Sequence, residues 1–168
     1  MKNFWNIFLI STAALSVGIF LSVRYFTKNK IESITYDSKI DKTELNLCDK
    51  DQIGQYYMFS TDYNGGKKAI KNILLPKIRK DELSFGKKSG TITIRFIVNC
   101  KGETGIFRVK AINKKLIATD FDNAKTEHLI SLVKELKNWT VETKNGKKYD
   151  SYYFINFKIT NGLVSDIF

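Results

Sequence analysis

Few residues in this 168-residue chain have the type and spacing that chemistry at a protein site requires. The chain holds one histidine, His128, and two cysteines, Cys48 and Cys100, with no CxxC, HxxxH or HExxH spacing. Such spacings bring metal ligands together, so we expect no metal centre and no cofactor. Asp120 and Asp122 are paired carboxylates, but a helix cap explains them better than an acid–base pair does. No nucleophile–base pair or phosphate-binding glycine loop is present, so the chain is predicted not to be an enzyme.

The net charge favours acidic partners. Lys and Arg number 28 against 17 acids, a formal net charge of +11. All 17 acids and 24 of the basic residues lie after residue 31, which leaves an excess of seven basic residues there. Such an excess attracts anionic lipid, acidic polymer or nucleic acid. The alternative is lysines scattered over a solvated surface, and the lack of a nucleic-acid-binding motif argues against nucleic acid.

The N-terminal segment predicts a membrane span. Phe4 to Val23 is a run of twenty residues without a charge, long enough for a helix to cross the ~30 Å hydrocarbon core of a bilayer. Trp5 and Arg24-Tyr25 suit the two interfaces. A cleaved signal peptide is the alternative, but its apolar region would be shorter than this one. We therefore expect an uncleaved anchor over residues 1–27.

Two signals disagree about the orientation of this anchor. Arg24, Lys28 and Lys30 outnumber Lys2, which favours a cytoplasmic C-terminal domain. Single N-terminal anchors with a basic start nevertheless usually export the domain that is attached to their C-terminal end. We expect export, and hence a single-pass inner-membrane protein with its C-terminal domain in the periplasm.

Residues 28–60 are predicted to form a tether. The segment is polar and charged up to Gly54 and contains no proline, so it is not a stiff polyproline spacer. A few tens of residues at ~3.3–3.6 Å each reach roughly 100 Å. Gln55 to Ser60 is aromatic enough to dock on the domain, as a strand or as a loop. The folded domain is then expected over residues 61–168.

Hydrophobic periodicity predicts the elements of that domain. A helix is expected over 67–75, with Pro76 ending or bending it, and a hairpin comes next with strands over 90–98 and 107–111. A second helix, capped by Asp120 or Asp122, is expected to stop near Trp139. A third strand over 152–160 alternates again and ends at Asn161-Gly162. This order predicts an α+β fold, a two-layer α/β sandwich with a three-stranded antiparallel sheet and two helices on one face, preceded by the N-terminal transmembrane helix.

Four segments in this order resemble the TonB C-terminal domain family, in the form found in short membrane-anchored proteins. Gly65-Gly66 and the helix after it resemble the opening GG-x-x-A-I, and GTITIRFIVNCKGETG is similar to the hairpin G-x-V-x-V-x-F-x-V-x-x-x-G-x-I. The second helix, like the family's, closes on a tryptophan, Trp139, which we expect to plug the space between helix and sheet rather than to be an exposed contact. Asn145-Gly146-Lys147 and YYFINFKI resemble the N-G-K turn and the final strand. The resemblance covers residues 65–162 and supports export.

The chain also departs from the family pattern. Trp139 is succeeded by Thr140-Val141-Glu142 where Trp-x-Pro-Gly is usual, and Leu75-Pro76 stands near the place of a tyrosine-proline pair. The anchor lacks the histidine of S-x-x-x-H, and one proline in the whole chain rules out a Pro-rich spacer. The last two departures bear on coupling to a proton-driven motor rather than on the fold.

The resemblance implies a module that binds a segment of an outer-membrane receptor or another envelope protein by strand addition to an exposed sheet edge. A more specific hypothesis is that this binding transduces energy to receptors for nutrient transport, with a proton-driven motor complex in the inner membrane. The expected edge is the third strand, and the side chains expected to face the partner are Tyr152, Phe154, Asn156 and Lys158. The alternative is that they only cover the sheet. An anchored basic domain that binds anionic polymer or lipid, with no role in transport, is the alternative function, and a homodimer stays open.

Whether the two cysteines form a disulfide depends on whether the domain is exported. In an oxidising periplasm Cys48 and Cys100 could pair in a disulfide. The closed loop of about fifty residues would contribute about 4 kcal/mol by the chain-entropy model, and it would pin the tether to the hairpin turn. Paired and free thiols both stay open.

Overall fold

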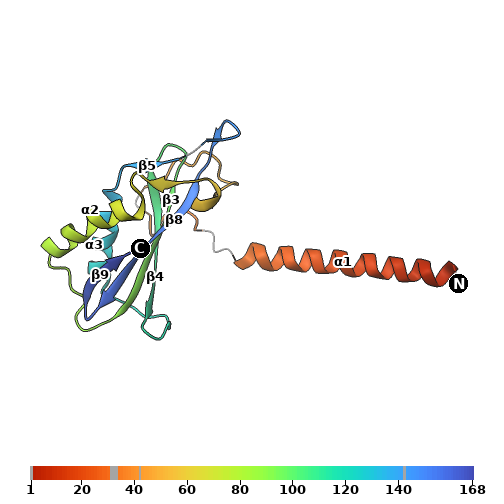
Figure 1. Ribbon diagram of the computed structural model, residues 1–168, viewed down its shortest axis with the longest axis horizontal. Coiled ribbons are helices and arrows are strands. Elements are labelled where there is room, and N and C mark those ends of the chain that lie inside the picture. The colour runs from red at the N-terminus through yellow and green to blue at the C-terminus, as the bar shows by residue number, and fades with distance from the viewer. Residues whose placement is uncertain (1, 31–33, 42, 142) are drawn as a thin grey trace. The chain divides into compact units, whose positions relative to one another are not determined.

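The computed structural model describes residues 2–30, 34–41, 43–141 and 143–168, and the chain divides into two compact units, Met1–Ile34 and Thr35–Phe168. The first unit holds the helix α1 (Lys2–Lys30), which is red to orange in Figure 1. Within it, Trp5–Arg24 is long and apolar enough to cross a membrane. This agrees with the predicted span, although a signal sequence near the N-terminus would pass the same test.

Five strands form the main sheet of the second unit, as far as the structure describes it. β4 (Thr104–Asn113) and β8 (Ser151–Thr160) flank β3 (Gly90–Val98), and both are antiparallel to it. β1 (Gly54–Gln55) pairs in parallel with the start of β8, and β9 (Leu163–Ile167) pairs antiparallel with its end.

The predicted three-stranded sheet is therefore wrong. A two-residue strand such as β1 leaves no alternation to detect in the sequence. The turn at Asn161-Gly162 does not end the sheet but returns the chain into β9. The α/β class and the three long strands agree with the sequence prediction.

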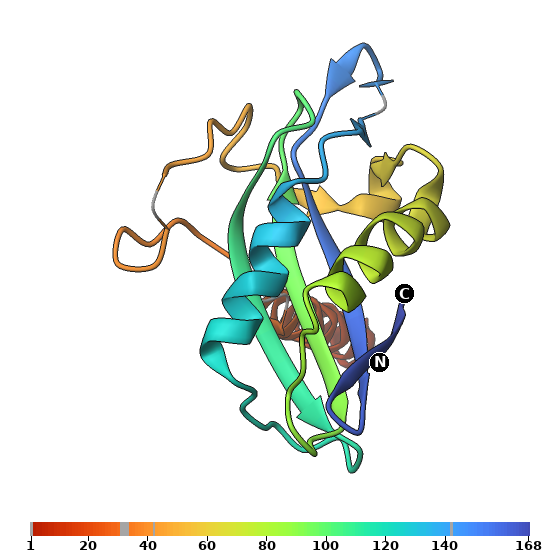
Figure 2. The ribbon, with the colours of Figure 1, turned by 90° about the vertical axis from the view of Figure 1, so that its left-hand side faces the viewer.

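Two helices cover one face of this sheet, as Figure 2 shows. α2 (Gly66–Lys80) continues through Pro76, which was predicted to end or bend it, because Ile78 is buried one turn beyond Leu74 and holds the extension on the core. α3 (Asn123–Lys134) begins after Asp122, whose carboxylate accepts the Lys125 N–H at 3.0 Å. The side chains that the two helices bury are Ile70, Leu74, Ile78, Leu129, Ile130, Leu132 and Val133.

Shorter elements complete the unit. The 3-10 helix η1 (Tyr56–Met58) comes directly after β1, and two small pairs lie outside the main sheet. These pairs are β2 (Asp62–Tyr63) with β5 (Trp139–Thr140), and β6 (Thr143–Lys144) with β7 (Lys147–Lys148).

Trp139 fills the space between α3 and the sheet. It is 8% exposed, its indole N–H donates to the Leu136 carbonyl at 2.9 Å, and its ring lies edge-on to Tyr153 and Phe96 with centroids 4.8 and 5.3 Å away. Burying a side chain of this size contributes about 2–3 kcal/mol. The prediction that Trp139 is a structural plug is confirmed.

Residues 35–53, here called the strap, belong to the folded unit. Leu45 of the strap is 9% exposed and packs on Gly105 of β4, where a Cβ atom would lie only 2.9 Å from the Leu45 Cβ. Glycine at this position therefore lets the strap come close to the strand. Most of the segment predicted as a tether over 28–60 is thus folded against the sheet.

Candidate functional site

The strand predicted to be the open edge lies inside the sheet. β3 pairs with β8 over its whole length. On the other side of β8, β1 pairs at Ser151 and Tyr152, and β9 pairs from Phe157 to Thr160. Asn156 exchanges two further hydrogen bonds with Phe168, at 3.0 and 3.1 Å. The prediction that β8 is an open edge is wrong, because most of its outward main-chain groups already have partners.

The four side chains expected to face a partner lie on the outer face of β8. Tyr152 is 6% exposed, and burial raises the pKa of its phenol. Phe154 is half-buried, and the Lys67 ammonium lies 5.3 Å from its ring centroid. Asn156 is half-buried and Lys158 is exposed. Their role in binding stays a prediction.

The open edge of the sheet is β4, the last strand in the order. The Thr119 N–H donates to the Ala111 carbonyl at 3.0 Å, so Val109, two residues before Ala111 in the same register, also turns its main-chain groups away from β3. A bulge interrupts this register at Phe107, whose carbonyl accepts a hydrogen bond from Arg108 at 2.7 Å. The outward N–H and C=O of Val109, which is 36% exposed, have no hydrogen-bond partner among the described residues.

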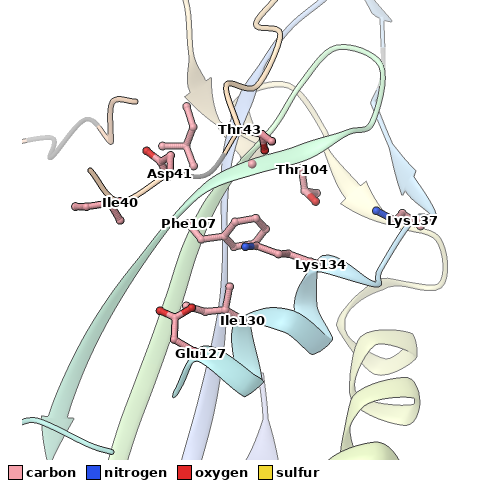
Figure 3. Close-up of a pocket in the computed structure, with 11 residues that line it drawn as sticks. Ile40, Asp41, Thr43, Thr104, Phe107, Glu127, Ile130, Lys134 and Lys137 are labelled. Atoms are coloured by element: carbon pink, nitrogen blue, oxygen red, sulfur yellow. The ribbon is translucent and has the colours of Figure 1, made fainter. Parts of the chain in front are cut away.

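A groove runs beside this edge, between β4 and α3. We call it the β4 groove. Phe107 and Val109 form its floor, and Glu127, Ile130 and Lys134 of α3 form its wall. It includes cavities of about 280 and 220 Å³, and Figure 3 shows the larger one, where Lys134 crosses the Phe107 ring at 5.1 Å. The groove thus has an apolar floor and is lined by charged side chains of both signs, with Lys137 and Asp120 in addition to Lys134 and Glu127.

The strap bounds one end of the β4 groove. In Figure 3, Asp41 and Thr43 lie across the cavity from α3. The Arg108 guanidinium donates to both carboxylate oxygens of Asp41 at 2.8 Å and to the Thr35 carbonyl at 2.6 Å. These hydrogen bonds hold the pKa of Asp41 below its usual value and raise the pKa of Arg108. No sequence signal could have paired these two residues, because 67 positions separate them.

A disulfide fixes the other end of the strap. Cys48 and Cys100 are joined, with their Cα atoms 6.1 Å apart, so of the two alternatives that the sequence left open the structure shows the paired one. The buried Asp150 carboxylate accepts the N–H groups of Cys48 and Asp49 at 2.7 and 2.9 Å, and that of Cys100 at 2.8 Å. Cys48, Cys100 and Asp150 lie close enough to hold a metal ion. Their atoms are already used in the disulfide and in these three bonds, so they act as a clamp.

The remaining candidates for chemistry do not converge on the β4 groove. His128 contacts Asp81, with Nε2 and Oδ2 2.8 Å apart, and both side chains are more than a third exposed. Asp122 caps α3, as one of the two alternatives predicted. Asp120 accepts a hydrogen bond only through its carbonyl, from Lys88 at 2.6 Å. These geometries explain the residues as surface contacts and a helix cap.

Comparison with known proteins does not identify the chain. No family model, no curated protein and no solved structure matches it. The assignment of a function therefore rests on the geometry of the β4 groove and on the sequence.

Proposed function

We propose that this protein is a membrane-anchored binding module that takes an extended segment of another envelope protein by strand addition to β4. The observation that carries the proposal is the open main chain of Val109 beside the apolar β4 groove. An unpaired edge strand beside a helix-lined groove is a recurrent way to bind an extended peptide.

The geometry limits the segment that would fit. The strap bounds one end of the open edge, and the Thr119–Ala111 hydrogen bond closes the other. A short strand between them would bond to Val109 and place alternate side chains over the groove. Apolar side chains suit the floor, whereas Lys134 and Glu127 would select for polar groups at the wall.

Two features support a periplasmic location for the module. α1 is long and apolar enough to be a single-pass anchor. A structural disulfide is typical of an oxidising compartment such as the bacterial periplasm. Both fit the TonB-like resemblance, in which the partner is an outer-membrane receptor and a proton-driven motor supplies energy for transport. The anchor has no histidine that could contact such a motor. We therefore propose binding of an extended segment as the function, and energy transduction as a more specific hypothesis that depends on it.

Val109→Pro tests strand addition. Proline removes the outward N–H and is tolerated on an edge strand, so the fold should persist while the bound strand is lost. We expect Val109→Pro to weaken binding at least tenfold, about the effect of one lost hydrogen bond together with a steric clash. The matched control is Val109→Ala, which shortens the side chain but keeps the N–H.

The binding assay uses the full chain in nanodiscs against an array of segments from receptor N-termini and periplasmic proteins. Circular dichroism and thermal unfolding check that both variants are folded. An array with no bound segment would contradict the proposal, as would equal binding by wild type and Val109→Pro. Pairing of β4 between two copies, the homodimer left open by the sequence, would appear as a mass that depends on concentration.

A further inference from the structure

Three connections meet at the end of the sheet where β4 finishes, at the bottom of Figure 2. They are residues 86–89, 113–118 and 160–163, here called the basic end. The Ser89 hydroxyl accepts the Asn161 N–H at 2.9 Å, and the Gly162 N–H donates to the Lys88 carbonyl at 2.7 Å. Asn113 pairs with Gly90, the residue directly after the first connection. The three connections therefore form one surface.

The charged side chains of the basic end itself are all positive. The basic end contains four lysines and no aspartate or glutamate, and its lysines are Lys87, Lys88, Lys114 and Lys115. All four are exposed. A hollow of about 530 Å³ is lined by Lys87, Lys114 and Lys115. Such a hollow suits the phosphate of an anionic headgroup.

The tip of the basic end is apolar. Leu116 and Ile117 are 77% and 59% exposed. Single exposed apolar residues are ordinary, but these two are adjacent at a loop tip, directly after Lys114 and Lys115. Exposed apolar residues beside lysines are typical of segments that enter a lipid interface.

The loop is held in a conformation that presents Leu116. The Asn113 side chain accepts the N–H groups of Lys115 and Ile117 at 2.8 and 3.2 Å, and its own N–H donates to the Ile117 carbonyl at 2.9 Å. Leu116 has φ of +61°, a left-handed conformation that is costly for a bulky residue and easy for glycine. A strained and exposed leucine does not stabilise the fold, and such strain is typical of functional positions.

We propose that the basic end docks the folded unit on an anionic lipid bilayer, with Leu116 and Ile117 inserted at the headgroup boundary. Charge selects lipid over a second copy of this chain, which would bring four more lysines against the same surface. Docking would place the last residue of β4, Asn113, near the lipid, and the rest of the strand would extend away from the bilayer.

The test measures how close individual methyl groups come to lipid. The full chain is placed in nanodiscs that carry a gadolinium-chelating headgroup, in phosphatidylcholine alone or with phosphatidylglycerol. We expect the relaxation enhancement of the Leu116 and Ile117 methyls to rise at least fivefold with the anionic lipid and to fall again in high salt. The methyl of Met58, 54% exposed and on η1, should change little and serves as the internal reference.

Three variants decide between docking and a general charge effect. Lys114→Glu with Lys115→Glu should abolish the enhancement, whereas the matched control Lys67→Glu with Lys68→Glu, on α2, should keep it. Leu116→Gly should also reduce the relaxation enhancement of the Ile117 methyl groups. This variant is expected to fold because glycine accepts the left-handed backbone. Equal enhancement at Leu116 and Met58 would overturn the proposal. Equal loss in the two double variants, or an enhancement that depends on protein concentration rather than on lipid charge, would overturn it as well.

Discussion

At the scale of single residues, Asp150 has the most demanding environment. Its side chain is fully buried and its two oxygens accept three main-chain N–H groups, two from the strap and one from the turn after β3. Hydrogen bonds to a charged acceptor are worth more than neutral ones. One carboxylate thus holds together the same two segments that the disulfide joins.

We predict that Asp150→Ala lowers the free energy of unfolding by about 3 kcal/mol, because it leaves three donors without their acceptor. Urea unfolding of wild type and variant measures the difference. Asp51→Ala, two positions beyond one of the donors and exposed, is the control and should change stability little. Similar losses in the two variants would show that the three bonds do not stabilise the unit.

Single residues also show what a sequence can reveal. The pairing of Cys48 with Cys100 could be predicted because the chain holds only these two cysteines. The contact of Arg108 with Asp41 could not, since an ion pair leaves no periodicity and many charged residues were equally plausible partners. The burial of Asp150 was hidden for the same reason.

At the scale of elements, the identity of the edge strand decides where a partner can bind. β4 is open because the chain places its additional strands, β1 and β9, on β8. The long strands could be predicted from alternation, but the order in which they pair depends on contacts that are distant in sequence. The sequence therefore predicted the three long strands but not that β8 lies inside the sheet and β4 at its edge.

The strap should loosen in acid. The folded pKa of Asp41 is lowered by Arg108, so their contact contributes its full stability above the unfolded pKa of about 4 and loses it as the pH falls through the lower folded value. We predict that Asp41→Asn lowers the free energy of unfolding by about 1–2 kcal/mol at pH 7.

Urea unfolding across pH tests this sign. The difference between Asp41→Asn and wild type should shrink below about pH 4, as Asp41 of the wild type becomes protonated. Glu44→Gln, in an exposed ion pair of the strap with Lys50, is the matched control and should have little effect at either pH. A difference that stays constant down to pH 2 would contradict the assigned role of the ion pair.

At the scale of the whole molecule, the folded unit begins much earlier than the sequence suggested. Residues 35–53 were expected to be free chain because they show no periodicity, yet Leu45, the Asp41–Arg108 contact and the disulfide attach them to the sheet. The folded unit therefore begins at Thr35, well before the residue 61 that the sequence suggested.

The side of the membrane on which the C-terminal domain lies can be tested on the whole chain. We predict that alkaline phosphatase fused after Phe168 is active, because the enzyme needs an oxidising compartment to form its own disulfides. The same fusion without residues 1–30 should be inactive and remain in the cytosol. Activity of the shortened fusion alone would contradict export by α1, and so would a full-length protein in cells with both cysteines reduced.

The disulfide also determines how the molecule would respond to mechanical force. If a partner held on β4 were pulled away from the anchor, tension would enter the folded unit at Thr35. It could draw out residues 35–47 at most, about 45 Å of chain, before Cys48 passed the load covalently to Cys100 in the turn between β3 and β4. β1 and α2 would lie outside the loaded path. With the disulfide formed, the unit would extend only until Cys48 bears the load. With the disulfide reduced, the same force would continue to unfold the unit from β1 onward.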